Sequence, residues 1–98
     1  MTITKAQNGS ALVLSVEGRL DTVTAPDLEK EIVAVEADVN ELTVDFSKLD
    51  YISSAGLRVL LSAHKAFVKK GGMVVKNVNE TLLDIFEVTG FKDILNIQ

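Results

Sequence analysis

The chain has 98 residues, of which 47% are hydrophobic and 24% are charged, and its formal net charge is −4 at pH 7. This length and composition are typical of one small globular domain, which we expect to span residues 1–98. The absence of cysteine excludes disulfides, thiolate metal sites and a cysteine nucleophile. The acidic balance argues against direct binding of nucleic acid or of anionic membranes.

No targeting or membrane-spanning segment is apparent. No apolar run approaches the roughly 20 residues that a membrane helix needs. The segment Met1–Lys5 lacks the charged region followed by an apolar region that starts a signal peptide. We therefore expect a cytoplasmic protein without membrane insertion.

The chain begins with a predicted β-hairpin. Thr2–Gln7 and Ala11–Glu17 are the expected strands. Asn8 and Gly9 between them tolerate positive φ, which favours a tight turn. Gly18 is expected to end the second strand.

A helix is predicted to follow the hairpin. Thr24 is the expected N-cap, and Pro26 lies in the first turn, where its fixed φ suits a helix. The apolar residues recur at the spacing of one helical face. They are Leu28, Ile32 and Val35.

The central segment predicts a strand and a second helix. Apolar and polar residues alternate over 42–46, as in a half-buried strand. An amphipathic helix is expected from about Gly56 to Lys69. Gly71 and Gly72 then end it.

The remaining segment predicts one more strand and a third helix. Met73–Val78 reads as a strand, Asn79 as a helix N-cap and Gly90 as the C-cap of a helix that ends near Thr89. Ile94–Ile97 is expected to form a short edge strand.

The predicted order is therefore β-β-α-β-α-β-α-(β). Alternating strands and helices indicate an α/β fold, and the opening hairpin makes the sheet of four to five strands mixed but mostly parallel. Function in such sheets gathers on loops at the carboxyl ends of strands. Two such loops stand out, Gly18–Pro26 and Asp50–Gly56.

The second of these loops contains Ser53, Ser54, Ala55 and Gly56, directly before the expected helix. A serine here can simply cap free backbone N–H groups. It can also present a hydroxyl at the positive end of the helix, where an added phosphate is tolerated. Position alone leaves both interpretations open.

The first loop contains Asp21, which is either a turn or capping acid or a carboxylate beside Ser54. Asp45, expected near the end of its strand, is likewise either a site residue or a plain exposed strand residue. Arg58, Lys65, Lys69 and Lys70 form the nearest approach to a basic patch. This patch has no interleaved aromatic residues, so base stacking is not expected.

The sequence offers no set of catalytic groups. His64 is the only histidine and lies ten residues after Ser54. The predicted helix begins between them, so the two side chains would lie roughly 12–15 Å apart, whereas a general base must lie within about 3 Å of its proton. Gly-rich phosphate loops and the Gly-x-Ser-x-Gly motif are absent. We therefore expect a protein that is not an enzyme and uses no cofactor.

The segment Tyr51–Leu61 closely resembles the signature of the STAS family of anti-sigma-factor antagonists. Gly18–Asp21 followed by Ala25-Pro26 resembles a second marker of that family, and Leu42–Ser47 also fits. The resemblance spans essentially the whole chain, and it implies a single STAS domain.

The resemblance also implies the site residues. The family pattern is Asp-Ser-(Ser/Thr)-Gly with its first serine phosphorylated, which corresponds here to Ser54. Ser53 stands where the family often has Asp, and is the alternative acceptor; Ala55 replaces a second hydroxyl. The implied partner-binding residues are Asp21, Thr22, Ser53, Ser54, Ala55, Gly56, Leu57 and Arg58.

Partner switching is the mechanism that the resemblance implies. The unphosphorylated protein would bind an anti-sigma factor that is itself a serine kinase, and so release a sigma factor for transcription. Phosphorylation of Ser54 would end binding, and a metal-dependent serine phosphatase would reset the switch. The ATP and the metal would then belong to the partners. The alternatives are a STAS-type subunit of a stress-sensing or lipid- or anion-transport complex, an enzyme, and a plain structural subunit.

Overall fold

Four strands form one sheet in the order β1-β2-β3-β4 in the computed structural model, which describes all of residues 1–98. They are β1 (Thr2–Asn8), β2 (Ala11–Leu20), β3 (Glu41–Ile52) and β4 (Gly72–Lys76). β1 runs antiparallel to β2, whereas the β2–β3 and β3–β4 pairs are parallel. The prediction of a mixed, mostly parallel sheet is confirmed.

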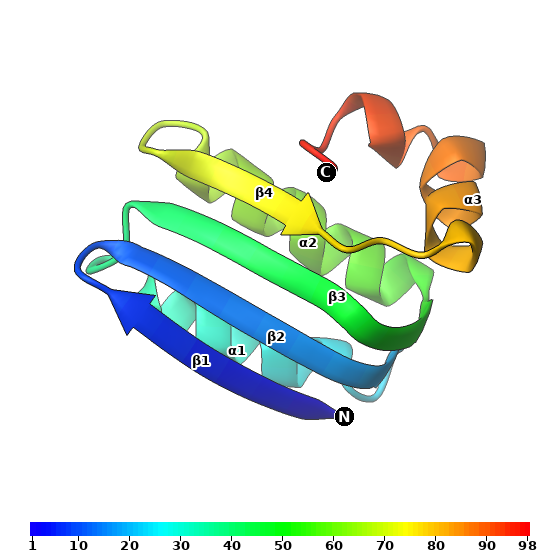
Figure 1. The fold of residues 1–98 in the computed structure, drawn as a ribbon, viewed down its shortest axis with the longest axis horizontal. Helices are drawn as coiled ribbons and strands as arrows, with labels where there is room; N and C mark the ends of the chain where they lie inside the picture. The colour runs from blue at the N-terminus through cyan, green and yellow to red at the C-terminus, as the bar shows by residue number, and fades with distance from the viewer.

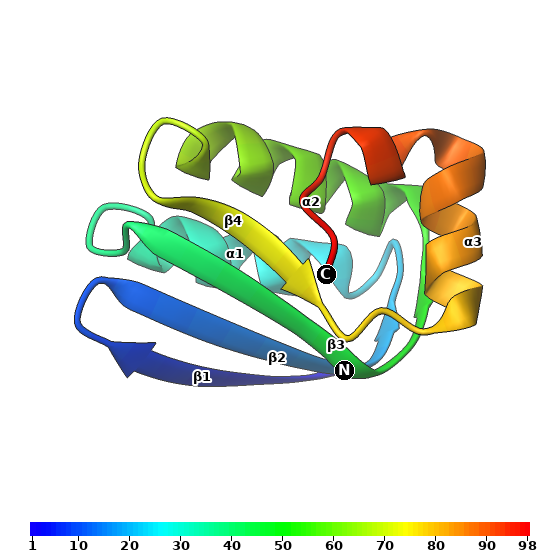
Figure 2. The same ribbon diagram turned by 45° about the horizontal axis from the view of Figure 1, so that its top comes forward.

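Three α-helices accompany the sheet: α1 (Ala25–Val35), α2 (Ser54–Phe67) and α3 (Glu80–Thr89). Helices α1 and α2 cover one face of the sheet, and α3 stands at its end, beside β3 (Figure 1, Figure 2). The opposite face, which is turned to the viewer in Figure 1, carries no helix. The predicted order of the first seven elements is therefore confirmed.

Alternation along the strands builds the core. The even-numbered residues from Leu12 to Val16 in β2 and from Leu42 to Phe46 in β3 are buried, as are Met73 and Val75 in β4. The core cluster has 23 buried residues, all of them hydrophobic. Each large side chain among them contributes about 1.5–3 kcal/mol relative to an exposed one, so the sheet and its two covering helices form one unit.

Strand β2 is longer than predicted, because a glycine can continue a strand through a bulge, and β3 is longer because it pairs with the added part of β2. Gly18 has φ +100° and lies inside β2, at a register shift between β2 and β3. The strand continues beyond it to Leu20, which pairs with Ile52 of β3. The expectation that Gly18 ends β2 is therefore wrong.

The other end of β2 and the chain terminus also differ from expectation. The hairpin turn is Gly9-Ser10 rather than Asn8-Gly9, and Gly9 alone of these takes positive φ, at +64°. Ile94–Ile97 does not form a strand. A 3-10 turn at Phe91–Asp93 continues into backbone hydrogen bonds from Ile94 and Leu95 to the Phe91 carbonyl. Only one bridge, between Val75 and Ile97, then reaches the edge of β4.

The third helix follows the prediction. The side chain of Asn79 accepts a hydrogen bond from the Leu82 N–H, and Gly90 takes the left-handed conformation at φ +80°. Asn79 also donates to the Leu49 carbonyl at 3.2 Å, which fixes the start of α3 against β3.

Lys70, at the end of the second helix, stabilises the C-terminus of the first. Its ammonium donates to the carbonyl oxygens of Glu36 and Val39, and lies 5.2 Å from the ring centre of Phe67. Helix α1 has no basic residue in its own last turn. A cation at this end offsets the helix dipole and satisfies free carbonyl groups. Lys70 is thus a structural lysine within the predicted basic patch.

We expect Lys70→Met to lower the free energy of unfolding by about 1 kcal/mol, because the cation is lost while most of the aliphatic stem remains. Urea denaturation measures this change. Lys69→Met is the matched control, since Lys69 is exposed and makes no such bonds, and it should change stability by less than about 0.5 kcal/mol. Equal losses in the two variants would contradict the capping role.

Candidate functional site

The carboxyl ends of β2 and β3 bring the two predicted loops together. Arg19 pairs with Tyr51 and Leu20 with Ile52 in the parallel register. The Ser53 N–H donates to the Leu20 carbonyl at 2.8 Å. The Asp21 loop (residues 21–24) is therefore tied by the backbone to the segment 50–54, as the position of such segments in open α/β sheets predicts. We keep the name serine loop for 50–54, although β3 continues to Ile52 and α2 begins at Ser54, so the predicted loop Asp50–Gly56 is reduced to Ser53.

Asp21 organises its own loop. Its Oδ1 accepts hydrogen bonds from the Val23 and Thr24 N–H groups at 3.0 and 3.1 Å. The Thr24 hydroxyl accepts from the Asp21 N–H and donates to the Arg19 carbonyl, both at 2.8 Å. Thr24 stands at the predicted N-cap position of α1, but its backbone angles are helical and its side chain makes no capping hydrogen bond. The hydrogen bonds from Thr24 and Val23 hold the pKa of Asp21 below its usual value.

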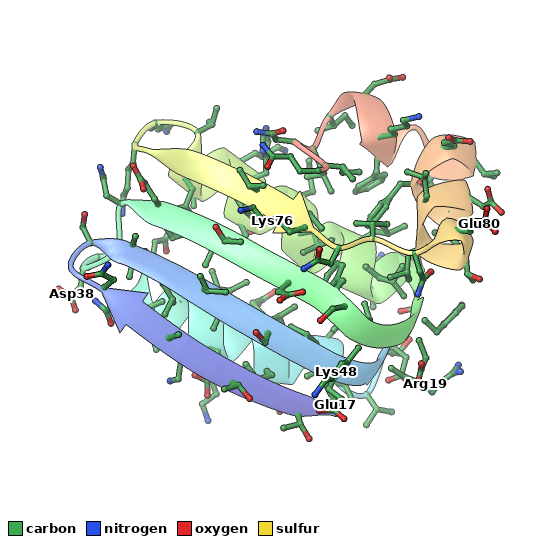
Figure 3. The ribbon with its side chains drawn as sticks, viewed as in Figure 1. Glu17, Arg19, Asp38, Lys48, Lys76 and Glu80 are labelled. Atoms are coloured by element: carbon green, nitrogen blue, oxygen red, sulfur yellow. The ribbon has the colours of Figure 1, made fainter.

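Arg19 lies on the outer side of this loop. Its guanidinium stacks over the Tyr51 ring at 4.5 Å, and its Nε lies 3.9 Å from Asp21 Oδ2. Figure 3 shows Arg19 at the end of the sheet where β2 finishes, opposite to the end where Asp38 lies. Stacking on Tyr51 and attraction to the Asp21 carboxylate both favour this position of Arg19, because guanidinium groups interact with ring faces as well as with anions.

The two adjacent serines differ in their surroundings. Ser53 is the N-cap of α2, and its hydroxyl oxygen accepts from the Gly56 N–H in a long bond of 3.5 Å. Ser54 is the first residue of the helix and is exposed. Its hydroxyl makes no hydrogen bond within the protein, so the capping and presenting roles belong to different residues.

Gly56 sets how closely α2 approaches the strands. A Cβ atom at this position would lie 2.8 Å from Ile52 Cγ1 and 2.8 Å from Leu20 Cγ. Both are core side chains, so any larger residue would push the helix away from the sheet. Leu57 is 4% exposed and belongs to the same core. Of the predicted partner-binding residues, Gly56 and Leu57 therefore face inward, and their contribution is to hold Ser54 in place.

The remaining predicted residues surround an open hollow between the starts of α1 and α2. Thr22 and Arg58 are exposed and Ala55 is half-buried. The hollow is lined by Thr22, Ala25, Pro26, Glu29, Ala55, Arg58 and Val59. Sequence reasoning missed Glu29, and also Val23, an apolar side chain that is 82% exposed within the Asp21 loop. The only indication in the sequence that Val23 is exposed is its place in a loop between two threonines.

Asp45 and His64 lie outside this site. Asp45 is in the middle of β3, where it accepts hydrogen bonds from Asn77 Nδ2 at 3.0 Å and from the Ser47 N–H at 2.9 Å. Both hydrogen bonds lower the pKa of Asp45, and the bond from Asn77 has the larger effect. It lies on the sheet face without helices, in a hollow with Glu17 and Lys48, which Figure 3 shows beside each other. The expectation that Asp45 lies just before the serine loop is wrong, because β3 continues to Ile52.

His64 and Ser54 lie on one helix, because α2 begins at Ser54, two residues before the predicted start near Gly56. Ten residues of helix separate them by roughly 15 Å, which is too far for general base catalysis. His64 Nδ1 is buried without a hydrogen-bond partner. The structure holds no group of three or more acidic or histidine side chains arranged for a metal ion. None of its helices combines the length and apolarity needed to cross a bilayer.

Comparison with known proteins identifies the domain. The sequence model described as "STAS domain" matches residues 2–98. The chain belongs to the STAS-domain family. The resemblance inferred from the serine loop and the Gly18–Asp21 segment is therefore confirmed, and so is the STAS fold class.

Two relatives at 30% identity are named anti-sigma factor antagonists. The anti-sigma-B factor antagonist of Bacillus subtilis is 30% identical over 92 residues, which cover 93% of this chain and 84% of that protein. An anti-sigma factor antagonist from Mycobacterium paratuberculosis has a crystal structure that is 30% identical, with a TM-score of 0.88 over 98% of this chain and 83% of the other.

The fold also matches a Bacillus protein, SpoIIAA, whose structure is known in two forms. Identity is 16% in each case. The TM-score is 0.78 for the unphosphorylated form, over 99% of this chain and 87% of the other, and 0.77 for the phosphorylated form, over 99% and 91%. At this identity the likeness concerns the fold alone.

The lowered pKa of Asp21 makes a pH-dependent prediction. Because its folded-state pKa lies below the unfolded value, its stabilising contribution is complete above the unfolded pKa and is lost as the pH falls through the folded one. We expect Asp21→Ala to lower the free energy of unfolding at neutral pH, and the deficit to shrink on acidification. Urea denaturation at a series of pH values measures it. Asp84→Ala, which removes an exposed carboxylate of α3 without hydrogen bonds, should show little deficit at any pH. A deficit for Asp21→Ala that persists in strong acid would contradict the role of the charge.

Proposed function

We propose that this STAS-domain protein is an anti-sigma factor antagonist that works as a phosphorylation-controlled partner switch, with Ser54 as the acceptor. The observation that carries the proposal is the exposed Ser54 hydroxyl, which has no partner within the protein. It stands beside the Asp21 loop in a domain whose relatives are named as anti-sigma factor antagonists. The proposed partner surface is the Asp21 loop, the serine loop and the hollow lined by Thr22, Ala55 and Arg58.

The difference between the two serines supports Ser54 over Ser53 as acceptor. A kinase needs a hydroxyl that is exposed on the protein surface and can align with a phosphoryl donor. Ser53 caps the helix, is half-buried, and its backbone N–H is bonded to the neighbouring strand. Ser54 satisfies the kinase's requirement without breaking any contact of the fold.

The physical basis of release is electrostatic. A phosphoserine carries −1.5 to −2 charges at pH 7. At the start of a helix this charge is compatible with the fold. In a docked interface beside Asp21 it brings repulsion and the cost of desolvation, roughly 2–5 kcal/mol for a charge left buried and unpaired. That corresponds to a factor of tens to thousands in affinity, so binding can be switched without refolding.

The similarity to both forms of SpoIIAA agrees with a switch of this kind. The two TM-scores differ by 0.01. Both forms thus share the fold of this chain, which supports a switch that acts through the charge of the phosphate. Under this proposal the partner is an anti-sigma factor with serine-kinase activity, and a serine phosphatase resets the switch. ATP and any catalytic metal are supplied by those partners.

The acceptor can be tested directly. We expect Ser54→Ala to abolish phosphorylation by the kinase partner. Ser53→Ala should still be phosphorylated on Ser54, with stability lowered by about 1 kcal/mol through loss of the cap. Mass spectrometry locates the phosphate, and urea denaturation measures stability. Phosphate on Ser53 in the wild type would overturn the assignment.

Binding gives the second test. Wild type, Ser54→Ala and Ser54→Asp serve as baits for affinity capture from the native lysate, with mass spectrometry to identify what is held. We expect an ATP-binding kinase to be held by the first two and lost, by a factor of at least ten, with Ser54→Asp. An aspartate near a helix N-terminus does not weaken the helix, so the loss is not one of folding.

Ser62→Asp is the matched control, because Ser62 is an exposed serine two turns further along α2. It should bind like the wild type. Equal binding by all baits would contradict the proposed phosphorylation switch. If those baits all held membrane-transport proteins, the domain would belong to a transport complex instead.

A further inference from the structure

Arg58 lies close enough to Ser54 to pair with a negative charge added to that serine. The two residues are four apart at the start of α2, and both are exposed. Side chains at this spacing lie on one face of a helix, with Cβ atoms about 6 Å apart. An anion that precedes a cation by four residues is the more favourable order of the two.

Arg58 is also without a partner of its own. It forms neither a hydrogen bond nor an ion pair, whereas Arg19 stacks on Tyr51 near Asp21 and Lys70 is bound to the end of α1. Glu29 lines the same hollow as Arg58 but does not pair with it. The first turn of α2 contains no acidic residue that could occupy the guanidinium. A free guanidinium therefore borders the hollow in the unphosphorylated protein.

We propose that Arg58 binds the phosphate of phosphorylated Ser54 within the same helix. This proposal rests on the proposed function, which makes Ser54 the acceptor. Guanidinium groups bind phosphate through two parallel N–H···O bonds, which a single ammonium does not reproduce. Phosphorylation then has two effects on the surface: it adds negative charge beside Asp21, and it withdraws the cation from the hollow between α1 and α2.

The second effect adds to the switch. In the unphosphorylated protein the hollow offers a cation next to Glu29 and the apolar Val59. An acidic group of a docked partner can pair with that cation. Once Arg58 is paired with the phosphate, the partner's acid would be left without a counter-charge as well as facing a new anion. The same modification thus removes an attraction and adds a repulsion.

The experiment uses the protein with phosphoserine installed at position 54 by genetic encoding, so no kinase is needed. Phosphorus NMR follows the second ionisation of the phosphate, whose ordinary pKa is about 6. A nearby cation favours the dianion and lowers this pKa. We expect Arg58→Gln to raise it by about 0.2–0.4 unit, the size of one helical ion pair, and the difference to shrink in high salt.

Two further variants make the test specific. Arg58→Lys should restore part of the shift, because the charge returns without the two-pronged geometry. Arg19→Gln removes an equal charge from the same end of the molecule and should leave the phosphate pKa at the wild-type value. Equal pKa values for wild type and Arg58→Gln would overturn the pairing, and so would an equal effect of Arg19→Gln.

The experiments distinguish a failure of the Arg58–phosphate pairing from a failure of the proposed function. Failure of the pairing would leave the binding of Ser54→Ala and Ser54→Asp as predicted. Failure of the switch would appear in the capture experiment, while the phosphate pKa would still report whether Arg58 lies against it.

Discussion

The hydrogen bond from the Ser53 N–H to the Leu20 carbonyl, at 2.8 Å, holds together the parts of the molecule on which the proposed function depends. It closes the parallel pairing of β2 and β3 at their carboxyl ends, where β2 leads through the Asp21 loop into α1 and β3 leads into α2. The close approach of α2, which only a glycine at position 56 permits, adds a second constraint. With both in place, the Asp21 loop and Ser54 share one surface, although 33 residues of sequence separate Asp21 from Ser54.

Neighbouring residues have different roles at this surface. Ser53 satisfies the helix start and Leu57 anchors it in the core, so Ser54 is free of structural duties. Asp21 uses its carboxylate to shape its own loop and still contributes negative charge to the surface. A rigid support for a free hydroxyl suits a switch that changes charge rather than shape. The surface can gain a phosphate while the 23-residue core stays as it is.

Several differences between expectation and structure have one origin: local residue preference is outweighed by pairing between segments. Gly18 is a common strand end, yet β2 gains a further pair with β3 by passing through it as a bulge. Thr24 is a good cap in isolation, but its hydroxyl is already engaged with Asp21 and Arg19. Ile94–Ile97 has strand-like residues, but Leu95 packs in the core and bonds back to Phe91. Contact with β4 is therefore limited to the single bridge between Ile97 and Val75.

The sequence by itself determined the order of elements, the mixed sheet, the alternating positions over 42–46 of β3, the caps of α3 and the STAS motif around Ser54. These rest on periodicity and on the local conformational preferences of asparagine, glycine and proline. Tertiary structure alone decided which serine caps and which is exposed, that Leu57 is buried, that Asp45 lies far from the serine loop, and that Arg58 is unpaired while Lys70 is engaged. Each of these depends on where a second, distant segment comes to lie, and a side chain acquires a partner or loses its solvent only when that segment packs against it.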